Sequence, residues 1–170
     1  MQPEELKTLV QEVVREVLAR RQGEPAPAGP RVALGSDHGG FALKQRLKAF
    51  LEGKGHAVLD LGTHSPEACD YPDFAKAVAR AVQDGSCRAG IMIDGAGIGS
   101  SMVCNKLKGI RAALCYDLKT ILNSRQHNDA NVLTLGASAN PPEVVEEMVA
   151  TWLATPFEGG RHQKRVDKIE

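Results

Sequence analysis

A glycine-rich turn that carries a single acid is the stretch of this sequence best suited to chemistry. In IMIDGAGIGSSM, three apolar residues precede Asp94, and Gly95, Gly97 and Gly99 then occupy every second position. Glycine lets a backbone approach a ligand closely, and unpaired N–H groups at the start of a helix attract anions. The pattern therefore predicts an anion site, although a purely structural turn explains it equally well.

The spacing of these glycines argues against two common nucleotide sites. G-x-G-x-G is neither the dinucleotide pattern G-x-G-x-x-G nor the phosphate-binding pattern G-x-x-x-x-G-K-[ST]. The turn also follows the third predicted strand of the chain, where a dinucleotide turn follows the first. We therefore expect no nucleotide cofactor.

Two pairs of polar residues could bind a ligand or simply stabilise loops. Asp37-His38 stands in SDHGG, either as part of a binding site or as a capping acid beside a solvated histidine. His127-Asn128 stands in SRQHNDAN before an apolar run, where a buried structural network is an equal alternative. Neither pair decides the function by itself.

Two arginines near the end of the sequence are spaced to act together. Arg161 and Arg165 are four residues apart, so a helix over 161–169 would place them on one face. Two guanidinium groups on one face suit a phosphate group. A solvated basic face is the simpler alternative.

Strands and helices alternate along the part of the chain that must position these residues. Short apolar runs predict strands, and amphipathic runs between Gly, Pro and Asp residues predict helices. The expected strands are 32–34, 56–61, 89–93, 110–115 and 130–135, and the expected helices are 41–52, 72–83, 100–106, 117–125, 141–154 and 161–169. The pattern predicts an α/β fold: a Rossmann-like, doubly wound, five-stranded parallel sheet with helices on both faces.

The polar candidates fall where such a sheet binds its ligands, beyond the carboxyl ends of the strands. Asp37 and His38 follow the first expected strand, Tyr71 lies in the loop after the second, and Asp94 follows the third. We therefore expect these residues to gather at one edge of the sheet.

The first 30 residues form a separate region. Leucines and valines in residues 1–21 recur at spacings of three and four, which predicts an amphipathic helix. Residues 22–30 are a linker rich in Pro, Ala and Gly, and residues 31–170 form the globular domain. The helix could pack on its own domain, pair in a dimer, or dock on another protein.

Composition excludes several classes of protein. The net charge is zero and aromatic residues make up 4% of the chain, so we expect neither nucleic acid nor a membrane surface as partner. No apolar run approaches the ~18 residues of a membrane span, and the N-terminus has no signal pattern, which predicts a cytoplasmic protein. The four cysteines form no CxxC pair and have no histidine at ligand spacing, so we expect reduced thiols and no metal site.

Six segments together resemble one known family. SDHGG, DYPDFA, IxxDGAGIGSS, NKLKGIRA, SRQHNDANVLTLG and FEGGRHQKRV are similar, in this order, to the ribose-5-phosphate isomerase B family, which includes the subunits of galactose-6-phosphate isomerase. The resemblance covers residues 31–170. It implies an aldose–ketose isomerase of sugar phosphates, with ribose 5-phosphate first among them, that works through an enediol(ate) without metal or cofactor. It also implies a homodimer or dimer of dimers with shared active sites.

The resemblance assigns roles to the candidates. Asp94 would be the base, and the backbone N–H groups of Gly95, Gly97, Ile98 and Gly99 would hold the enediolate oxygens, with Ser100 beside them. Asp37, His38 and Tyr71 would contact the sugar, His127 and Asn128 of the partner subunit would open the ring and bind hydroxyls, and Arg161, Arg165 and Arg111 would hold the phosphate.

The sequence departs from the family pattern at the base. Many members carry Cys where this chain has Asp94 and Thr where it has Ala96, and others carry a Glu base where it has Ser100. Three interpretations stay open: Asp94 is the base, the site serves another substrate or works poorly, or the protein only binds sugar phosphate or acts as a scaffold. The run DGAG also resembles the A-type subunit of galactose-6-phosphate isomerase.

The N-terminal region resembles the encapsulation peptides of bacterial microcompartments. These are short amphipathic helices joined to an enzyme by a linker of Pro, Ala and Gly. The resemblance implies that residues 1–20 bind a shell protein or another cargo enzyme, and that the chain resides in the compartment lumen.

Overall fold

Five short apolar segments pair into one parallel sheet. The computed structural model describes residues 31–169, so the helix predicted over 1–21 and the linker over 22–30 lie outside the described residues. The strands are β1 (Val32–Ser36), β2 (Val58–Asp60), β3 (Ala89–Asp94), β4 (Ala112–Leu114) and β5 (Val132–Gly136). Their order is β2-β1-β3-β5-β4, and every pair is parallel. The predicted five-stranded parallel sheet is confirmed.

The edge strands are shorter than the sequence pattern predicts. β1, β3 and β5 are fully buried, whereas β2 and β4 have three residues each and are half-buried. An edge strand has a pairing partner on one side only. The apolar runs 56–61 and 110–115 therefore extend beyond the segments that actually pair.

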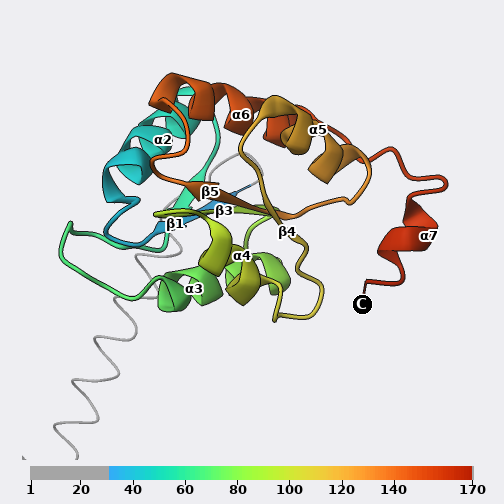
Figure 1. The fold of residues 1–170 in the computed structure, drawn as a ribbon, viewed down its shortest axis with the longest axis horizontal. Helices are drawn as coiled ribbons and strands as arrows, with labels where there is room; N and C mark the ends of the chain where they lie inside the picture. The colour runs from blue at the N-terminus through green and yellow to red at the C-terminus, as the bar shows by residue number, and fades with distance from the viewer. Residues whose placement is uncertain (1–30, 170) are drawn as a thin grey trace, which may run out of the picture.

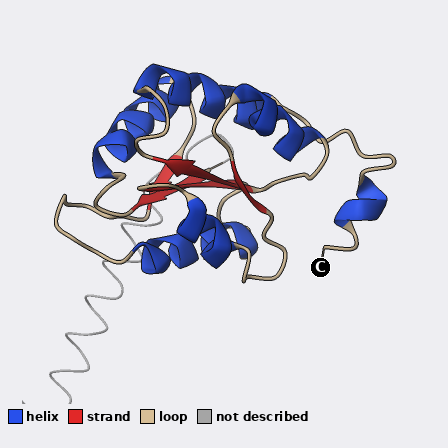
Figure 2. Cartoon of the chain, in the orientation of Figure 1, coloured by secondary structure: helices blue, strands red, loops and turns tan. Residues whose placement is uncertain are grey.

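Helices cover both faces of the sheet, as predicted (Figures 1 and 2). One layer contains α2 (Phe41–Gly53), α5 (Leu118–Gln126) and α6 (Pro142–Ala154), and the other contains α3 (Tyr71–Gln83) and α4 (Ile98–Cys104). Leu47, Ile121 and Trp152 belong to the core of the first layer, and Val78 and Cys104 belong to the core of the second. No helix in the described part of the chain is long and apolar enough to cross a membrane.

The last helix is much shorter than the sequence pattern predicts. Residues 161–169 were expected to be helical, but α7 is a single turn, Gln163–Val166, and Arg161 lies in the turn before it. Val166 is the one buried residue of α7, and a helix this short needs packing to be stable. The prediction that both arginines share one helical face is therefore wrong, although both are exposed.

A buried ion pair fixes the path of the chain after β2. The Lys44 side chain is fully buried in α2, and its Nζ lies 2.5 Å from Asp60 Oδ1 at the end of β2. Burial alone would raise the pKa of Asp60, but hydrogen bonds from Lys44 and from the Gly62 N–H lower it overall. The loop that leads to Tyr71 therefore starts from a fixed point.

The strand order creates a switch point between β1 and β3. The chain leaves β1 through α2 on one face, pairs β2 beside it, and returns to place β3 on the other side of β1. The connection after β3 leads to α4 on the opposite face, so the two loops diverge and leave a crevice. The Asp37 N–H still donates to Ile93 O at 3.1 Å. Asp37 and Asp94 therefore start neighbouring loops at one edge of the sheet.

Candidate functional site

The side chain of Asp94 lies inside the turn that it begins. Its Oδ1 accepts hydrogen bonds from the N–H groups of Ala96, at 2.9 Å, and Gly97. Its Oδ2 accepts from the Ser100 N–H, at 3.0 Å, and from the Ser100 hydroxyl. The residue is 5% exposed. A carboxylate has about four lone-pair directions, so this network occupies all of them.

The turn therefore holds an anion that belongs to the protein. The N–H groups of Ala96, Gly97 and Ser100 are directed at Asp94. The N–H groups of Ile98 and Gly99 belong to the first turn of α4, where a helix has no acceptor of its own. These two are the N–H groups that the helix start can still offer to a ligand.

Two glycines of the turn are required by packing. Gly97 has φ +78°, and a Cβ there would lie 2.5 Å from Leu114 Cδ1 and 2.9 Å from the Leu135 carbonyl carbon. A Cβ on Gly99 would lie 2.5 Å from Cζ of Tyr71. The Tyr71 ring therefore lies directly against the start of α4. Tyr71 was expected in the loop after the second strand, but it is the first residue of α3, so this contact joins the starts of α3 and α4.

The remaining carboxyl-edge candidates lie in the first loop. Asp37 is 8% exposed, and its Oδ1 accepts from the Gly40 N–H at 3.0 Å. A Cβ on Gly39 would lie 3.4 Å from Asp37 Oδ1 and 3.9 Å from Gly95 N, so the two loops meet here. His38 is exposed, with Nδ1 3.3 Å from both N and O of Cys69. The predicted gathering of these residues is confirmed.

No buried thiol replaces the missing cysteine of the turn. Burial raises the pKa of Cys104, the cysteine nearest the turn in sequence, to about 12. Burial also raises the pKa of Cys87 and of Cys115. Cys69 is half-buried and contacts His38 through its backbone. Asp94 is therefore the titratable side chain at the centre of the turn.

The other candidates lie at the amino ends of the strands, opposite the carboxyl edge that holds Asp94. α5 starts beyond the carboxyl end of β4 and runs back across the sheet, and His127 caps its far end. Arg111 immediately precedes β4 and donates to Asp129 Oδ2 at 2.9 Å. Figure 1 shows α7, which contains Arg165, beyond the end of α5 and away from β1. One chain therefore does not bring these residues to Asp94.

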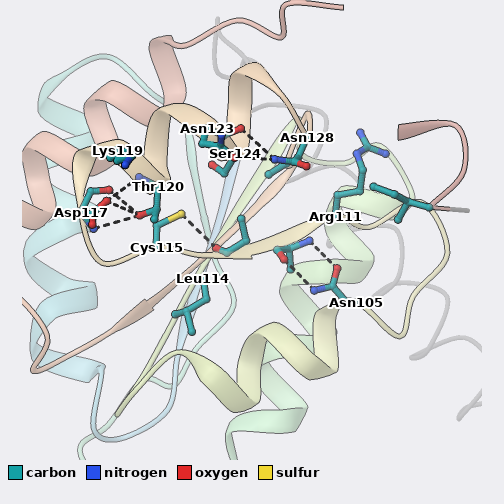
Figure 3. A pocket seen from close by; sticks show the side chains of 14 residues that line it. Asn105, Arg111, Leu114, Cys115, Asp117, Lys119, Thr120, Asn123, Ser124 and Asn128 are labelled. Carbon is teal, nitrogen blue, oxygen red and sulfur yellow. Dashed lines mark hydrogen bonds between the residues drawn. The ribbon is translucent and has the colours of Figure 1, made fainter. Parts of the chain in front are cut away.

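A hollow of about 660 Å³ adjoins this second group. It lies between the edge strand β4 and α5, and Figure 3 shows Arg111, Asn123 and Asn128 on its wall. Its apolar lining includes Leu114. The edge strand β4 and two predicted site residues, Arg111 and Asn128, therefore line one hollow.

The C-terminal segment is anchored on the end of α5. The rings of His127 and His162 are stacked, with centroids 4.1 Å apart and planes 3° from parallel. Glu158 Oε2 lies 3.7 Å from His127 Nε2 and 3.8 Å from His162 Nε2. Burial lowers the pKa of His162, and electrostatic interactions with His127 and Arg161 lower it further. The His162 ring thus covers one face of His127.

These residues are poorly arranged for a metal ion. His127, Glu158 and His162 bring their ligand atoms within 4.8 Å of one another. However, the two rings are parallel, so their in-plane lone pairs run side by side and do not converge on one point. The Arg161 Nε also lies 3.3 Å from His162 Nε2. The cluster suits a pair of imidazoles with an anionic neighbour better than it suits a cation.

The sequence patterns did not identify several residues that contact the candidates. Glu158 and His162 belong to the FEGGRHQKRV segment, but the sequence pattern predicts no role for either residue. Asn123 lies one helical turn before His127, and this i, i+4 spacing was the available signal. Tyr116 donates to Ala96 O at 2.7 Å and so braces the turn from the loop after β4.

The fold and the turn together define a class of protein. A doubly wound parallel sheet with a glycine-rich turn at its switch point is a Rossmann-like α/β fold, the class in which ligands bind beyond the carboxyl ends of the strands. The family model described as Ribose/Galactose Isomerase matches residues 32–169. The chain belongs to this family.

Relatives in this family carry the names of sugar-phosphate isomerases. The chain is 45% identical over 139 residues to the ribose-5-phosphate isomerase B of Escherichia coli strain K12, covering 82% of this chain and 93% of that protein. It is 39% identical over 140 residues to the D-erythrulose-4-phosphate isomerase of Pectobacterium atrosepticum, covering 81% and 91%.

Solved structures agree. The ribose-5-phosphate isomerase B of Clostridium thermocellum matches with a TM-score of 0.81 and 47% identity, over 82% of this chain and 94% of that one. The type B ribose 5-phosphate isomerase of Trypanosoma brucei matches with a TM-score of 0.80 and 43% identity, over 83% of this chain and 97% of that one.

The packing of the turn predicts unequal effects of two alanine substitutions. Gly97→Ala should lower the free energy of unfolding by roughly 2–4 kcal/mol, because it adds a left-handed backbone penalty to a clash with the Leu135 backbone. Gly95→Ala is the matched control. A Cβ there meets nothing within 4 Å, so stability should change by about 0.5 kcal/mol or less. Urea unfolding of both variants tests this, and equal losses would contradict the packing argument.

Proposed function

We propose that this chain interconverts an aldose phosphate and a ketose phosphate, with ribose 5-phosphate and ribulose 5-phosphate as the pair. The observation that carries the proposal is the match of residues 32–169 to the isomerase family, with 45% identity to a ribose-5-phosphate isomerase B. The first turn of α4 at the switch point, with the N–H groups of Ile98 and Gly99, offers a place for the developing charge.

The proposed reaction is an internal proton transfer. A base removes the proton from C2 of the open aldose, the electron pair forms the C1=C2 bond, and O1 becomes an enediolate oxygen. The proton on O2 passes to O1, the C2=O bond forms, and C1 takes up the proton that the base removed from C2. Atoms and electrons balance without a redox partner. The N–H groups of Ile98 and Gly99 are suited to stabilise the enediolate oxygen, because fixed donors aimed at developing charge lower the barrier.

Asp94 can act as the base only if it gives up one of its internal hydrogen bonds. Three of its four donors are backbone N–H groups fixed by the turn. The fourth is the Ser100 hydroxyl, which can rotate about a single bond. We therefore assign Asp94 Oδ2 as the basic atom and the rotation of the Ser100 hydroxyl as the step that exposes it.

A second function is favoured by the same network. If all four hydrogen bonds persist, Asp94 is a structural anion, and the domain is a sugar-phosphate-binding or scaffold protein with little turnover. A third outcome is a related substrate. The relative named D-erythrulose-4-phosphate isomerase and the likeness to a galactose-6-phosphate isomerase subunit make tetrose and hexose phosphates the first candidates.

A panel of sugar phosphates distinguishes these functions. Wild-type protein should convert ribose 5-phosphate, and Asp94→Asn should lower kcat/KM by at least about 100-fold, the effect of losing a general base. Asp84→Asn, at an exposed carboxylate beyond α3, is the control. Full activity of Asp94→Asn would exclude Asp94 as the base. If the double variant Asp94→Cys/Ala96→Thr converts a sugar phosphate of the panel and the wild-type protein converts none, the result would support the binding or scaffold function.

We propose further that the active protein is a homodimer, or a dimer of dimers, with each site shared between two chains. In one chain, the residues around Asp94 lie at the carboxyl edge of the sheet and the residues around His127 lie at the amino edge. We call each of these groups a half-site. Large apolar side chains are exposed on a helix of each layer: Ile98 and Met102 on α4, and Leu118 and Leu122 on α5. A second copy could cover these side chains and join the half-sites.

Mixing two inactive variants tests the shared site. Asp94→Asn and His127→Gln should each be inactive as homodimers. In a mixed dimer, one of the two sites combines the intact half of each chain. After co-refolding at equal concentrations, about half of the dimers are mixed, so about a quarter of the wild-type turnover should return. No recovery in a sample shown by native mass spectrometry to contain mixed dimers would overturn the shared site.

We propose that residues 1–20 direct the chain into a bacterial microcompartment by binding a shell protein or another cargo enzyme. The support is the sequence pattern alone: apolar residues at helical spacing, followed by a linker rich in Pro and Ala. The domain would otherwise reside in the cytoplasm.

A reporter fusion tests the proposed targeting. Residues 1–30 fused to a fluorescent protein should collect in foci in cells that assemble compartments. Replacing Leu6, Val10 and Val13 with Glu should disperse the signal, because it removes the apolar face. Replacing Glu4, Lys7 and Glu12 with Gln is the matched control and should leave the foci. Diffuse fluorescence of the unaltered fusion would contradict the targeting role.

A further inference from the structure

A network of amide side chains connects the two predicted site residues at the end of α5. Asn123 lies one helical turn before His127, and its Nδ2 is 2.9 Å from His127 Nδ1. Asn128 Nδ2 donates to the backbone oxygen of Asn123 at 3.2 Å and to Asn123 Oδ1 at 3.1 Å. Figure 3 shows the Asn123 and Asn128 side chains facing each other across the wall of the hollow.

The backbone oxygen fixes the direction of every hydrogen bond in this network. A carbonyl oxygen can only accept, so the Asn128 atom beside it must be the amide nitrogen. The same NH₂ group donates to the Asn123 side chain, whose facing atom must therefore be Oδ1. The other end of the Asn123 amide, which faces His127, is then an NH₂ group, which can only donate. His127 Nδ1 is left as an acceptor.

We propose that Asn123 is a positioning residue for His127, which holds the neutral ring in the form that carries its proton on Nε2. The bond made by one ring nitrogen decides the state of the other. The inference rests on the proposed function, in which His127 opens the sugar ring. Nε2–H is then the group that delivers a proton to the ring oxygen. An N–H on Nδ1 would face the N–H of Asn123 and lose this contact.

The charged groups around His127 act on other parts of the ring. Glu158 Oε2 approaches Nε2 at 3.7 Å, and His162 covers one face. Arg161 is hydrogen-bonded to His162, and Arg165 is close enough to His162 to lower its pKa. On α5 itself, Arg125 pairs with Asp129 at 3.1 Å. Asn123 is therefore the position from which the state of Nδ1 can be altered directly.

Nitrogen NMR of the full chain measures this state. Long-range ¹H–¹⁵N spectra of labelled protein, assigned with His127→Gln, should show neutral His127 with a bare Nδ1 and a protonated Nε2. Asn123→Asp should move the proton to Nδ1, because a carboxylate can only accept. Asn140→Asp is the control, since Asn140 donates to Tyr116 O elsewhere, and it should leave His127 unchanged. A wild-type ring protonated on Nδ1 would overturn the proposal.

Kinetics separate positioning from a structural role. Ribulose 5-phosphate has no ring, because the O5 that would close it is esterified. Exchange of its C1 proton with D₂O needs only the enediolate. Asn123→Asp should therefore slow conversion of ribose 5-phosphate by about 100-fold and change the exchange rate by about twofold or less. Equal losses would make Asn123 merely structural. If wild-type protein shows neither reaction, the proposed function fails, and the NMR result alone decides the Asn123 proposal.

Discussion

The hydrogen bonds to one buried carboxylate hold together the part of the molecule on which its chemistry depends. Asp94 is the last residue of β3, and its side chain caps the start of α4, so one residue sets the angle between strand and helix. Hydrogen bonds to a charged group contribute roughly 1.5–3 kcal/mol each. The left-handed Gly97 and the contact between Gly99 and Tyr71 follow from this geometry. The same bonds that build the turn also occupy the lone pairs that a base must offer.

The sequence was sufficient to predict which residues share the carboxyl edge. Apolar runs locate the strands, and a parallel sheet places the residues after each strand at one edge, so Asp37, Tyr71 and Asp94 were expected together. The hydrogen bond from the Ser100 hydroxyl to Asp94 Oδ2 was not predictable, because it depends on the rotamer of the Ser100 side chain. The short α7 was also missed, because the spacing of Arg161 and Arg165 says nothing of packing.

The separation of the predicted site residues into two groups follows from the parallel architecture itself. Residues that follow strands gather at the carboxyl edge, and residues that follow helices gather at the amino edge, because each helix runs back across the sheet. His127 follows α5, and the segment from Glu158 to Arg165 follows α6. No rearrangement of a loop brings these residues to Asp94 across the full length of the strands. A site that needs both groups therefore calls for a second copy of the chain.

If each site is shared between two chains, as proposed, protein concentration would also control the activity. A separated chain would hold one half of two different sites and complete neither, so activity would follow the fraction of chains that are paired. That fraction depends on mass action, and dilution alone would lower it. Confinement of many chains in a small volume has the opposite effect. A compartment would then do more than retain intermediates: it would keep the chains above the concentration at which complete sites exist.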